Sequence, residues 1–171
     1  MGNFSLKFDK FWETFIKYNG YVKVLEGLKN TLTIAVLGLI IGIVIGTLIA
    51  TARVIPQYKV LPRILNKICS FYVALFRGTP IVVQLLVFYY VLLPLMGSRM
   101  TGIQVAVMVF GLNSAAYISE IMRGGIMSVD SGQMEAGRAV GLSFGTTMLK
   151  IVIPQAVKNI LPTMGNAVSY T

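Results

Sequence analysis

The sequence contains no histidine and only one cysteine, Cys69, in its 171 residues. Histidine is the commonest metal ligand and the commonest general base, and a lone cysteine cannot build a disulfide framework or a thiolate metal site. The phosphate-binding patterns G-x-x-x-x-G-K-S/T and G-x-G-x-x-G are also missing from the sequence. These absences argue against a membrane enzyme and against a nucleotide-binding protein. We therefore expect no catalytic residue, no metal site and no cofactor on this chain.

Charged residues are also scarce, at 12% of the chain, whereas hydrophobic residues make up 56%. A soluble globular domain has about 25% charged residues, so this composition is typical of an integral membrane protein. The 15 lysines and arginines outnumber the 6 acids and give a formal net charge of +9. Because these basic residues lie mostly between apolar runs, they indicate membrane topology. We expect a lipid bilayer, and no nucleic acid, as a partner.

An amphipathic helix is predicted over residues 1–19, and the dipeptide Asn19-Gly20 then breaks it. Its apolar positions follow the i, i+3, i+4, i+7, i+8 spacing, while lysines fall on the other faces. The apolar positions are Phe8, Phe11, Trp12, Phe15 and Ile16. Aromatic residues with lysines are typical of a helix in the bilayer interface, and the alternative is a flap packed on the protein's own surface. We assign residues 1–29 to this extracytoplasmic or interfacial segment.

Four membrane-spanning helices are predicted, at residues 30–52, 80–94, 103–119 and 154–171. The first has no charged residue and, at 1.5 Å per residue, can cross a hydrocarbon core of about 30 Å. The second follows a short apolar run at residues 68–76 and could join it through a bend. Small residues recur every four positions along the first helix, at Gly38, Gly42, Gly46 and Ala50. This stripe predicts a face on which another helix packs closely.

The basic residues predict the orientation of these helices. Residues 53–67 contain Arg53, Lys59, Arg63 and Lys67 and no acid. We therefore expect this loop on the cytoplasmic side of the membrane and the N-terminus on the outside. Counting the helices from there places the long loop at residues 124–150 on the cytoplasmic side as well.

A helix start is predicted at Thr79 and Pro80, because a hydroxyl N-cap followed by proline is typical of helix N-termini. Gln84 is the polar residue inside this helix. It either forms a hydrogen bond between helices or contacts a transported substrate. Arg77 lies near the membrane entrance, where it is an interfacial anchor, a partner for a helix end, or part of a gate.

The second half of the third predicted helix is unusually polar for a segment surrounded by lipid. Asn113, Tyr117 and Glu120 are spaced i, i+4, i+7 and share one face, with Ser114 beside them. Glu120 and Arg123 are three residues apart and can form an ion pair. Such a face points into protein or into a water-filled path. Two interpretations stay open: a substrate pathway with its gate, or a buried hydrogen-bond cluster that holds helices together.

The loop at residues 124–150 has a helical pattern of its own. Asp130 is suited to an N-cap, and Gln133 at the third helical position can complete a variant of the capping box. The helix is predicted over residues 131–140, with Gly141 in the C′ position that glycine favours. Ser143 can cap a second short helix that leads to Pro154.

The same loop resembles a known motif. From Glu135 it reads E-A-G-x3-G-x9-I-x-I-P, which resembles E-A-A-x3-G-x9-I-x-L-P, the EAA motif of permeases of ATP-binding-cassette (ABC) importers. Gly137 and Ile153 depart from that motif. Other stretches resemble the polar amino-acid branch of these permeases (histidine, glutamine, arginine and opines). They are N-T-L-T at residues 30–33, F-R-G-T-P at 76–80, A-Y-I-S-E-I-M-R-G-G-I at 116–126, G-Q-M-E-A at 132–136 and P-Q-A at 154–156.

This resemblance implies an all-α integral membrane fold in the bacterial plasma membrane. Residues 30–171 would form four transmembrane helices of a MetI-like ABC importer permease core. Members of the family continue beyond the equivalent of Thr171 into one further transmembrane helix. We therefore expect the family's final helix to be missing from this sequence.

The resemblance also implies how energy and substrate reach the permease. The helix at residues 131–140 would be a coupling helix that sits in a groove of a cytoplasmic ABC ATPase dimer, which binds ATP and Mg²⁺. The residues expected at this contact are Gln133, Glu135, Ala136, Gly137, Gly141 and Leu142. A second permease subunit would pack on the small-residue stripe, and an extracytoplasmic binding protein would deliver a polar amino acid to the polar face. The alternatives are a small channel or structural subunit without an ATPase, and a permease for another solute.

Overall fold

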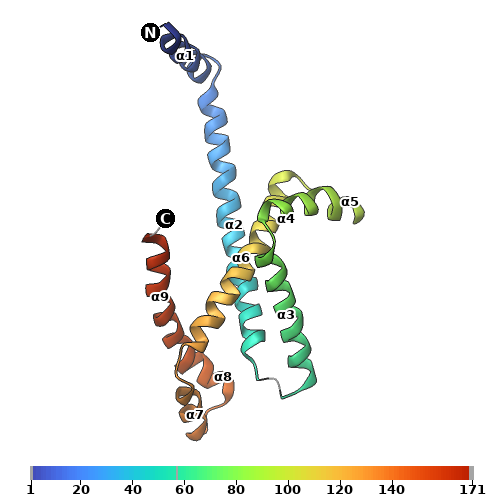
Figure 1. The fold of residues 1–171 in the computed structure, drawn as a ribbon, viewed down its shortest axis with the longest axis vertical. Helices are drawn as coiled ribbons and strands as arrows, with labels where there is room; N and C mark the ends of the chain where they lie inside the picture. Colours follow the sequence, from blue (N-terminus) through green and yellow to red (C-terminus); the bar gives the residue numbers. More distant parts are fainter. Residues whose placement is uncertain (1, 57, 170–171) are drawn as a thin grey trace.

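The computed structural model describes residues 2–56 and 58–169, and every regular element in these ranges is helical (Figure 1). In chain order the elements are α1 (Gly2–Trp12), η1 (Glu13–Lys17), α2 (Gly20–Val54), α3 (Val60–Gly78), α4 (Ile81–Val87), η2 (Phe88–Leu92), α5 (Leu93–Leu95), α6 (Gly102–Met127), α7 (Ser131–Ala139), α8 (Phe144–Thr147), η3 (Met148–Val152) and α9 (Ile153–Ser169), where η marks a π-helical turn. The all-helical fold predicted from the sequence is confirmed.

The longest element is α2, which has 35 residues and begins directly after Asn19. Asn19 has a left-handed backbone, with φ of 52°, and it separates α2 from η1, so the predicted helix break is confirmed. At 1.5 Å per residue α2 is about 52 Å long, well above the roughly 30 Å of a hydrocarbon core. The helix therefore contains the uncharged stretch at residues 30–52 and extends beyond it on the N-terminal side.

α1 lies at the far end of α2 and projects away from the rest of the chain (Figure 1). Its aromatic side chains Phe8, Phe11 and Trp12 are 54%, 58% and 57% exposed. Phe8 stacks on Trp12, and Phe11 stacks on Phe15 in η1, so the aromatic residues form one continuous face. The predicted helix is present, and the side chains of Phe8, Phe11 and Trp12 do not pack on the rest of the described chain. The contact of this face with lipid stays a prediction.

α2 and α6 form the main helix pair of the fold and meet at the small-residue stripe. All four stripe residues are buried: Gly38, Gly42, Gly46 and Ala50. A Cβ atom at Gly42 would lie 2.6 Å from the Cβ of Ser114, and one at Gly46 would lie 2.9 Å from the carbonyl oxygen of Ala115. Real Cβ atoms do not approach other atoms this closely. The glycines therefore allow the two backbones to come together.

The packing face predicted along this stripe is confirmed, but the partner suggested for it is wrong. The resemblance suggested a second subunit, whereas α6 of the same chain occupies the stripe. Gly111 of α6 completes the contact, because a Cβ atom there would lie 2.7 Å from Cγ2 of Ile41. A second subunit would therefore have to contact another surface.

α3 and the segment Ile81–Leu95 form an elbow that is bent by 107°. α3 begins at Val60, so residues 60–67, predicted as part of a loop, are helical. The proline at position 62 is compatible with this helix because it lies in the first turn, where backbone N–H groups have no intrahelical partner. The segment predicted at residues 80–94 is helical, and the bend that joins it to the preceding helix is confirmed.

α2 and α6 are each long and apolar enough to cross a membrane, and α3 together with Ile81–Leu95 is so as one bent pair. The described residues thus contain two straight candidate spans and one broken one. The fourth predicted span corresponds to α9, a helix of 17 residues. Tyr170 and Thr171 lie outside the described residues.

The apolar core is small, and α6 contributes to both of its clusters. One cluster joins Val73 and Phe76 of α3 to Ala116, and the other joins Leu93 of α5 to Val105 and Val109. Many large apolar side chains remain exposed on α2, including Leu39, Ile40 and Val44. Such an apolar surface suits a helix whose surroundings are lipid.

We predict that Gly46→Ala destabilises the protein, because the new Cβ would meet the Ala115 carbonyl and push α2 away from α6. Overpacking of this kind costs about 1–3 kcal/mol, which a lower unfolding temperature in detergent would report. Gly27→Ala is the matched control, since nothing lies within 4 Å of a Cβ atom at Gly27. Equal unfolding temperatures for the two variants would contradict the close packing of α2 on α6.

Candidate functional site

The candidate site is the loop that carries α7, at the opposite end of the molecule from α1 (Figure 1). Asp130 caps α7, since its Oδ1 accepts a hydrogen bond from the Gly132 N–H at 2.6 Å, and the predicted N-cap is confirmed. The predicted capping box is wrong. Oε1 of Gln133 instead accepts a hydrogen bond from Nε2 of Gln155 on α9, at 3.2 Å. The Gln155 amide on α9 thus replaces the backbone N–H of Asp130, which would be the donor to Gln133 in a capping box.

α7 ends in a Schellman motif at Gly141. The N–H of Gly141 donates to the carbonyl of Arg138 at 3.0 Å, and the N–H of Leu142 donates to the carbonyl of Gly137 at 3.1 Å. Gly141 has φ of 86°, in the left-handed region that glycine adopts without strain. The predicted C′ position is confirmed. α7 therefore has a defined end on both sides.

A glycine contact holds α7 against α8. A Cβ atom at Gly137 would overlap the side chain of Thr147, which is completely buried. Thr147 Oγ1 donates to the carbonyl of Ser143 at 3.0 Å, and Ser143 Oγ accepts the Thr146 N–H at 3.2 Å, so the predicted cap at Ser143 is confirmed. The departure from the EAA motif at Gly137 thus has a local reason, because an alanine there would collide with Thr147.

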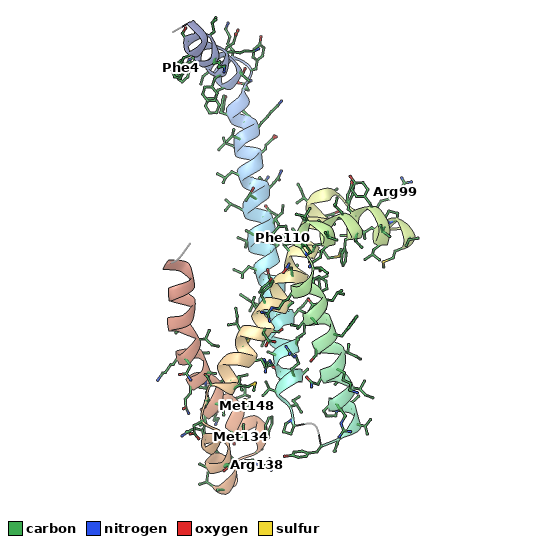
Figure 2. All side chains as sticks on the ribbon, viewed as in Figure 1. Phe4, Arg99, Phe110, Met134, Arg138 and Met148 are labelled. Carbon is green, nitrogen blue, oxygen red and sulfur yellow. The ribbon has the colours of Figure 1, made fainter. Side chains whose placement is uncertain are left out.

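The outward side of α7 is exposed. Among the predicted coupling residues, Gly137 is buried, whereas the other members are exposed: Gln133, Glu135, Ala136, Gly141 and Leu142. Figure 2 shows Met134 and Arg138 at the lower extremity of the molecule, far from Arg99 and Phe4. The helix is therefore fixed on one side and presents the other side to its surroundings.

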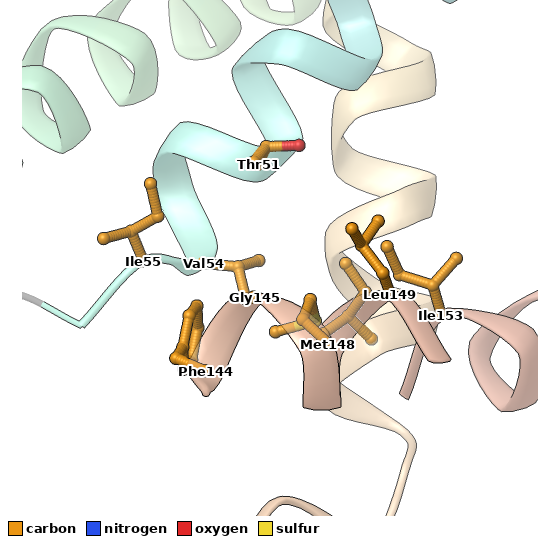
Figure 3. Close-up of a pocket in the computed structure, with 9 residues that line it drawn as sticks. Thr51, Val54, Ile55, Phe144, Gly145, Met148, Leu149 and Ile153 are labelled. Atoms are coloured by element: carbon orange, nitrogen blue, oxygen red, sulfur yellow. The ribbon is translucent and has the colours of Figure 1, made fainter. Parts of the chain in front are cut away.

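An apolar hollow of about 270 Å³ lies between the second half of this loop and the ends of α2 and α6 (Figure 3). Thr51, Val54 and Ile55 line it from α2, Ile126 lines it from α6, and Phe144, Gly145, Met148, Leu149 and Ile153 complete it. No charged side chain is part of this lining. The hollow is therefore suited to apolar neighbours and unsuited to a polar substrate.

An ion network joins α2 to α6 near the same end of the molecule. Oε2 of Glu120 lies 2.7 Å from Nη1 of Arg53, and Oε1 of Glu120 accepts from both Nε and Nη2 of Arg123, with 3.1 Å to Nε. The side chains of Arg53, Glu120 and Arg123 are only 12%, 24% and 30% exposed. The predicted Glu120–Arg123 pair is confirmed. Arg53, predicted as part of a loop, is the last basic residue of α2 and ties that helix to α6.

Gln84 closes the elbow between α3 and α4. Its Nε2 lies 2.8 Å from the carbonyl of Phe76, 3.0 Å from the carbonyl of Thr79 and 2.9 Å from Thr79 Oγ1. The last carbonyls of a helix have no intrahelical donor, so this buried amide supplies one to α3. Asn113 on α6 reaches Oε1 of Gln84 at 3.5 Å. These contacts support the predicted bond between helices, while a substrate contact stays a prediction.

The N-cap predicted at Thr79 is wrong. Thr79 Oγ1 donates to the carbonyl of Leu75 at 2.8 Å, and Pro80 holds the N-cap position of α4. The hydroxyl therefore closes the end of α3 instead of starting the next helix. The sharp bend at this point explains the difference, because Thr79 remains against the last turn of α3.

The predicted polar residues of α6 divide between two neighbours. Asn113, Ser114 and Tyr117 line a shallow hollow together with Ile81 of α4. The Arg77 guanidinium lies 5.2 Å from the centre of the Tyr117 ring, within range of a cation–π interaction that links α3 to α6. Glu120 is not part of this hollow, because its carboxylate is paired with Arg53 of α2. Whether a substrate passes along these polar residues stays a prediction.

Three residues of the site had no local signal in the sequence: Arg53, Thr147 and Gln155. Arg53 is 67 residues away from its partner Glu120, and Gln155 is 22 residues away from Gln133. Such pairs arise from helix packing, so residue spacing in the sequence cannot predict them. The P-Q-A resemblance drew attention to Gln155 but gave it no role.

Residues 38–171 match the family described as "Binding-protein-dependent transport system inner membrane component". The chain belongs to this family. The match includes α7 and the loop around it, so the resemblance to ABC importer permeases is confirmed.

Several curated relatives are similar to this chain. The identity is 41% over 143 residues with the arginine transport system permease protein ArtQ of Bacillus subtilis, covering 84% of this chain and 63% of that protein. It is 38% over 156 residues with the putative glutamine transport system permease protein GlnP of Rickettsia bellii, covering 91% of this chain and 69% of that protein. The chain therefore spans between 63% and 69% of the length of these two relatives.

Solved structures show the same fold. The crystal structure of an amino acid ABC transporter with histidines matches with a TM-score of 0.71 and 36% identity, over 90% of this chain and 69% of that chain. An inward-facing structure of the MetNI methionine ABC transporter matches with a TM-score of 0.58 and 22% identity, over 81% of this chain and 63% of that chain. The predicted MetI-like fold is confirmed.

We predict that Gly137→Ala loosens α7, because the added methyl group collides with the buried Thr147. The overpacking costs about 1–3 kcal/mol, so the local opening that exposes Arg138 to trypsin should increase about fivefold or more. Gly145→Ala is the matched control, since nothing lies within 4 Å of a Cβ atom there. Equal cleavage rates after Arg138 in both variants would show that the Gly137–Thr147 contact does not hold α7.

We also predict that Glu120→Gln destabilises the protein more than Arg53→Gln or Arg123→Gln does. Removing the carboxylate leaves two guanidinium groups without their ion partner, whereas each arginine variant leaves Glu120 one partner. The expected loss is about 2 kcal/mol, measured by thermal unfolding in detergent. A larger loss in either arginine variant would contradict the central position of Glu120 in the network.

Proposed function

We propose that this chain is the membrane-spanning permease subunit of an ABC importer that carries a polar amino acid. The observation that carries this proposal is α7, a helix that is capped at both ends, packed against Thr147 on one side and exposed on the other. The similar proteins named for arginine, glutamine and L-cystine transport support an amino acid as the substrate. Which amino acid this chain carries is a matter for transport assays.

ATP hydrolysis belongs to a partner chain in this proposal. A cytoplasmic ABC ATPase dimer binds ATP and Mg²⁺ and receives α7 in a groove on its surface. The exposed residues Glu135 and Ala136 lie at that contact. Closure of the ATPase dimer displaces α7 and rocks two permease subunits between inward-facing and outward-facing states.

The orientation follows from the distribution of basic residues. Arg53, at the end of α2, and the basic residues at the start of α3 lie at the same end of the molecule as α7 (Figure 1). By the positive-inside rule that end is cytoplasmic, so α1 and the N-terminus lie outside. An extracytoplasmic binding protein then delivers the substrate from the side of α1 and α5.

The polar face of α6 is the proposed lining of the substrate path. Asn113, Ser114 and Tyr117 lie beside the elbow, with Gln84 and Arg77 close to them. A path of this kind needs a second wall, which a second permease subunit, identical or related, supplies. Polar groups inside a membrane domain usually mark such pathways.

The test of this function is the contact between α7 and the ATPase. We expect Ala136→Phe to reduce the amount of co-expressed ATPase that purifies with the permease by about tenfold, because the added ring occupies the contact. Uptake of radiolabelled arginine and glutamine into proteoliposomes should fall in parallel. Ser98→Phe, at an exposed position on the outer turn, is the control for ATPase capture and should leave the captured amount unchanged. Full ATPase capture and uptake by the Ala136→Phe variant would contradict the proposed function.

A further inference from the structure

Gln155 lies in the first turn of α9 and contacts two helical segments with one amide nitrogen. Its Nε2 donates to Oε1 of Gln133 on α7 at 3.2 Å and to the carbonyl of Ile151 in η3 at 3.1 Å. An amide nitrogen has two protons, so both donors of this group are used. The direction of the side chain is therefore fixed by its own helix, and it points at α7.

The helix that carries Gln155 continues without interruption from the loop at residues 124–150, which we call the coupling loop. α8, η3 and α9 follow one another directly from Phe144 to Ser169. Pro154 has no N–H, and its ring crowds the carbonyl four residues earlier, which would break a regular α-helix. The π-helical turn η3 directly before it relaxes this conflict by changing the hydrogen-bond spacing. A displacement of α8 should therefore also move α9, because the two belong to one continuous helix.

Two of the contacts that hold α7 on this continuous helix come from one face of α7. Gly137 lies against Thr147 of α8, and Gln133 is hydrogen-bonded to Gln155 of α9. Gln133 and Gly137 are four residues apart, so the two contacts lie one turn apart on the same face of α7. α7 also packs on η3, and the Gln133–Gln155 bond adds a polar contact that defines the direction of the helix relative to α9.

We propose that Gln155 is a positioning residue that makes α7 and α9 move as one body. This inference rests on the proposed function, in which an ATPase displaces α7. With the Gln133–Gln155 bond in place, the displacement of α7 reaches α9 in full. Without it, only the packing on α8 and η3 holds α7, the helix can tilt relative to α9, and part of the ATPase movement is lost before it reaches the membrane helices.

The test measures coupling in the complete transporter, reconstituted in proteoliposomes with its ATPase and binding protein. Gln155→Leu removes both amide donors and keeps a side chain of similar size. We expect the number of radiolabelled arginine or glutamine molecules taken up per ATP hydrolysed to fall about three- to tenfold, in line with the loss of one hydrogen bond. ATPase capture and basal ATP hydrolysis should stay at the level of the unaltered protein, because Gln155 does not lie on the exposed face of α7.

Three further variants separate positioning from a general loss of structure. Gln133→Leu should lower the same ratio, and the double variant Gln133→Leu/Gln155→Leu should lower it no further than either single change. Gln155→Glu should restore part of the ratio, because the Gln133 amide can turn and donate to the new carboxylate, although the carboxylate cannot donate to the Ile151 carbonyl. Asn159→Leu is the matched control. It removes the hydrogen bond that the Asn159 side-chain amide on α9 donates to Ser128 Oγ, at 3.0 Å, and leaves the contact with α7 intact.

The inference is wrong if Gln155→Leu keeps the uptake-to-hydrolysis ratio of the unaltered transporter, or if Asn159→Leu lowers that ratio as much. It is also wrong if the effects of Gln133→Leu and Gln155→Leu add up in the double variant. A chain that captures no ATPase even without substitution would contradict the proposed function itself. The two failures are therefore distinguishable.

Discussion

The close approach of α2 and α6 is the contact on which the other helices depend. In lipid the hydrophobic effect does not draw helices together, so packing and polar bonds must do so. The stripe from Gly38 to Ala50 provides the packing, and the bond between Arg53 and Glu120 closes the end of the pair. α3, α4 and α9 then pack on α6. A displacement of α6 relative to α2 would therefore move the elbow and the coupling loop as well.

The coupling loop is connected to the α2–α6 pair by α9, which packs on α6. Gly125 of α6 lies against Ile160 and the carbonyl of Ala156, and Asn159 donates to Ser128 Oγ at 3.0 Å. The packing at Gly125 holds the start of α9 against the end of α6, directly beside the origin of α7. α7 itself is then fixed by the Gly137–Thr147 and Gln133–Gln155 contacts. The result is a small rigid unit at the end of the membrane helices, with one exposed helical face.

The features predicted correctly from the sequence are those that depend on neighbours within a few residues. The cap at Asp130, the end of α7 at Gly141, the cap at Ser143 and the Glu120–Arg123 pair are of this kind. The small-residue stripe predicts a packing face but not its partner, because a stripe does not specify which helix packs on it. The sequence does not predict the role of Thr79, which depends on the elbow, or that of Arg53, whose partner lies on another helix.

Gln133 shows how a tertiary contact can replace the local contact that the sequence favours. Its position three residues after Asp130 favours a capping box, and the isolated segment has no better partner for it. In the folded chain α9 places the Gln155 amide within 3.2 Å, and the tertiary bond replaces the local one. This tertiary bond joins α7 to α9, and the role inferred for Gln155 is to hold these two helices in a fixed orientation.

The central claim is that the exposed face of α7 receives the movement of an ATPase. Hydrogen–deuterium exchange of the permease, with and without its ATPase, tests this claim most directly. We expect the backbone amides of residues 131–142 to become protected when the ATPase binds, while those of the outer turn at residues 97–101 exchange as before. Unchanged exchange at residues 131–142, together with protection elsewhere on the chain, would contradict this claim.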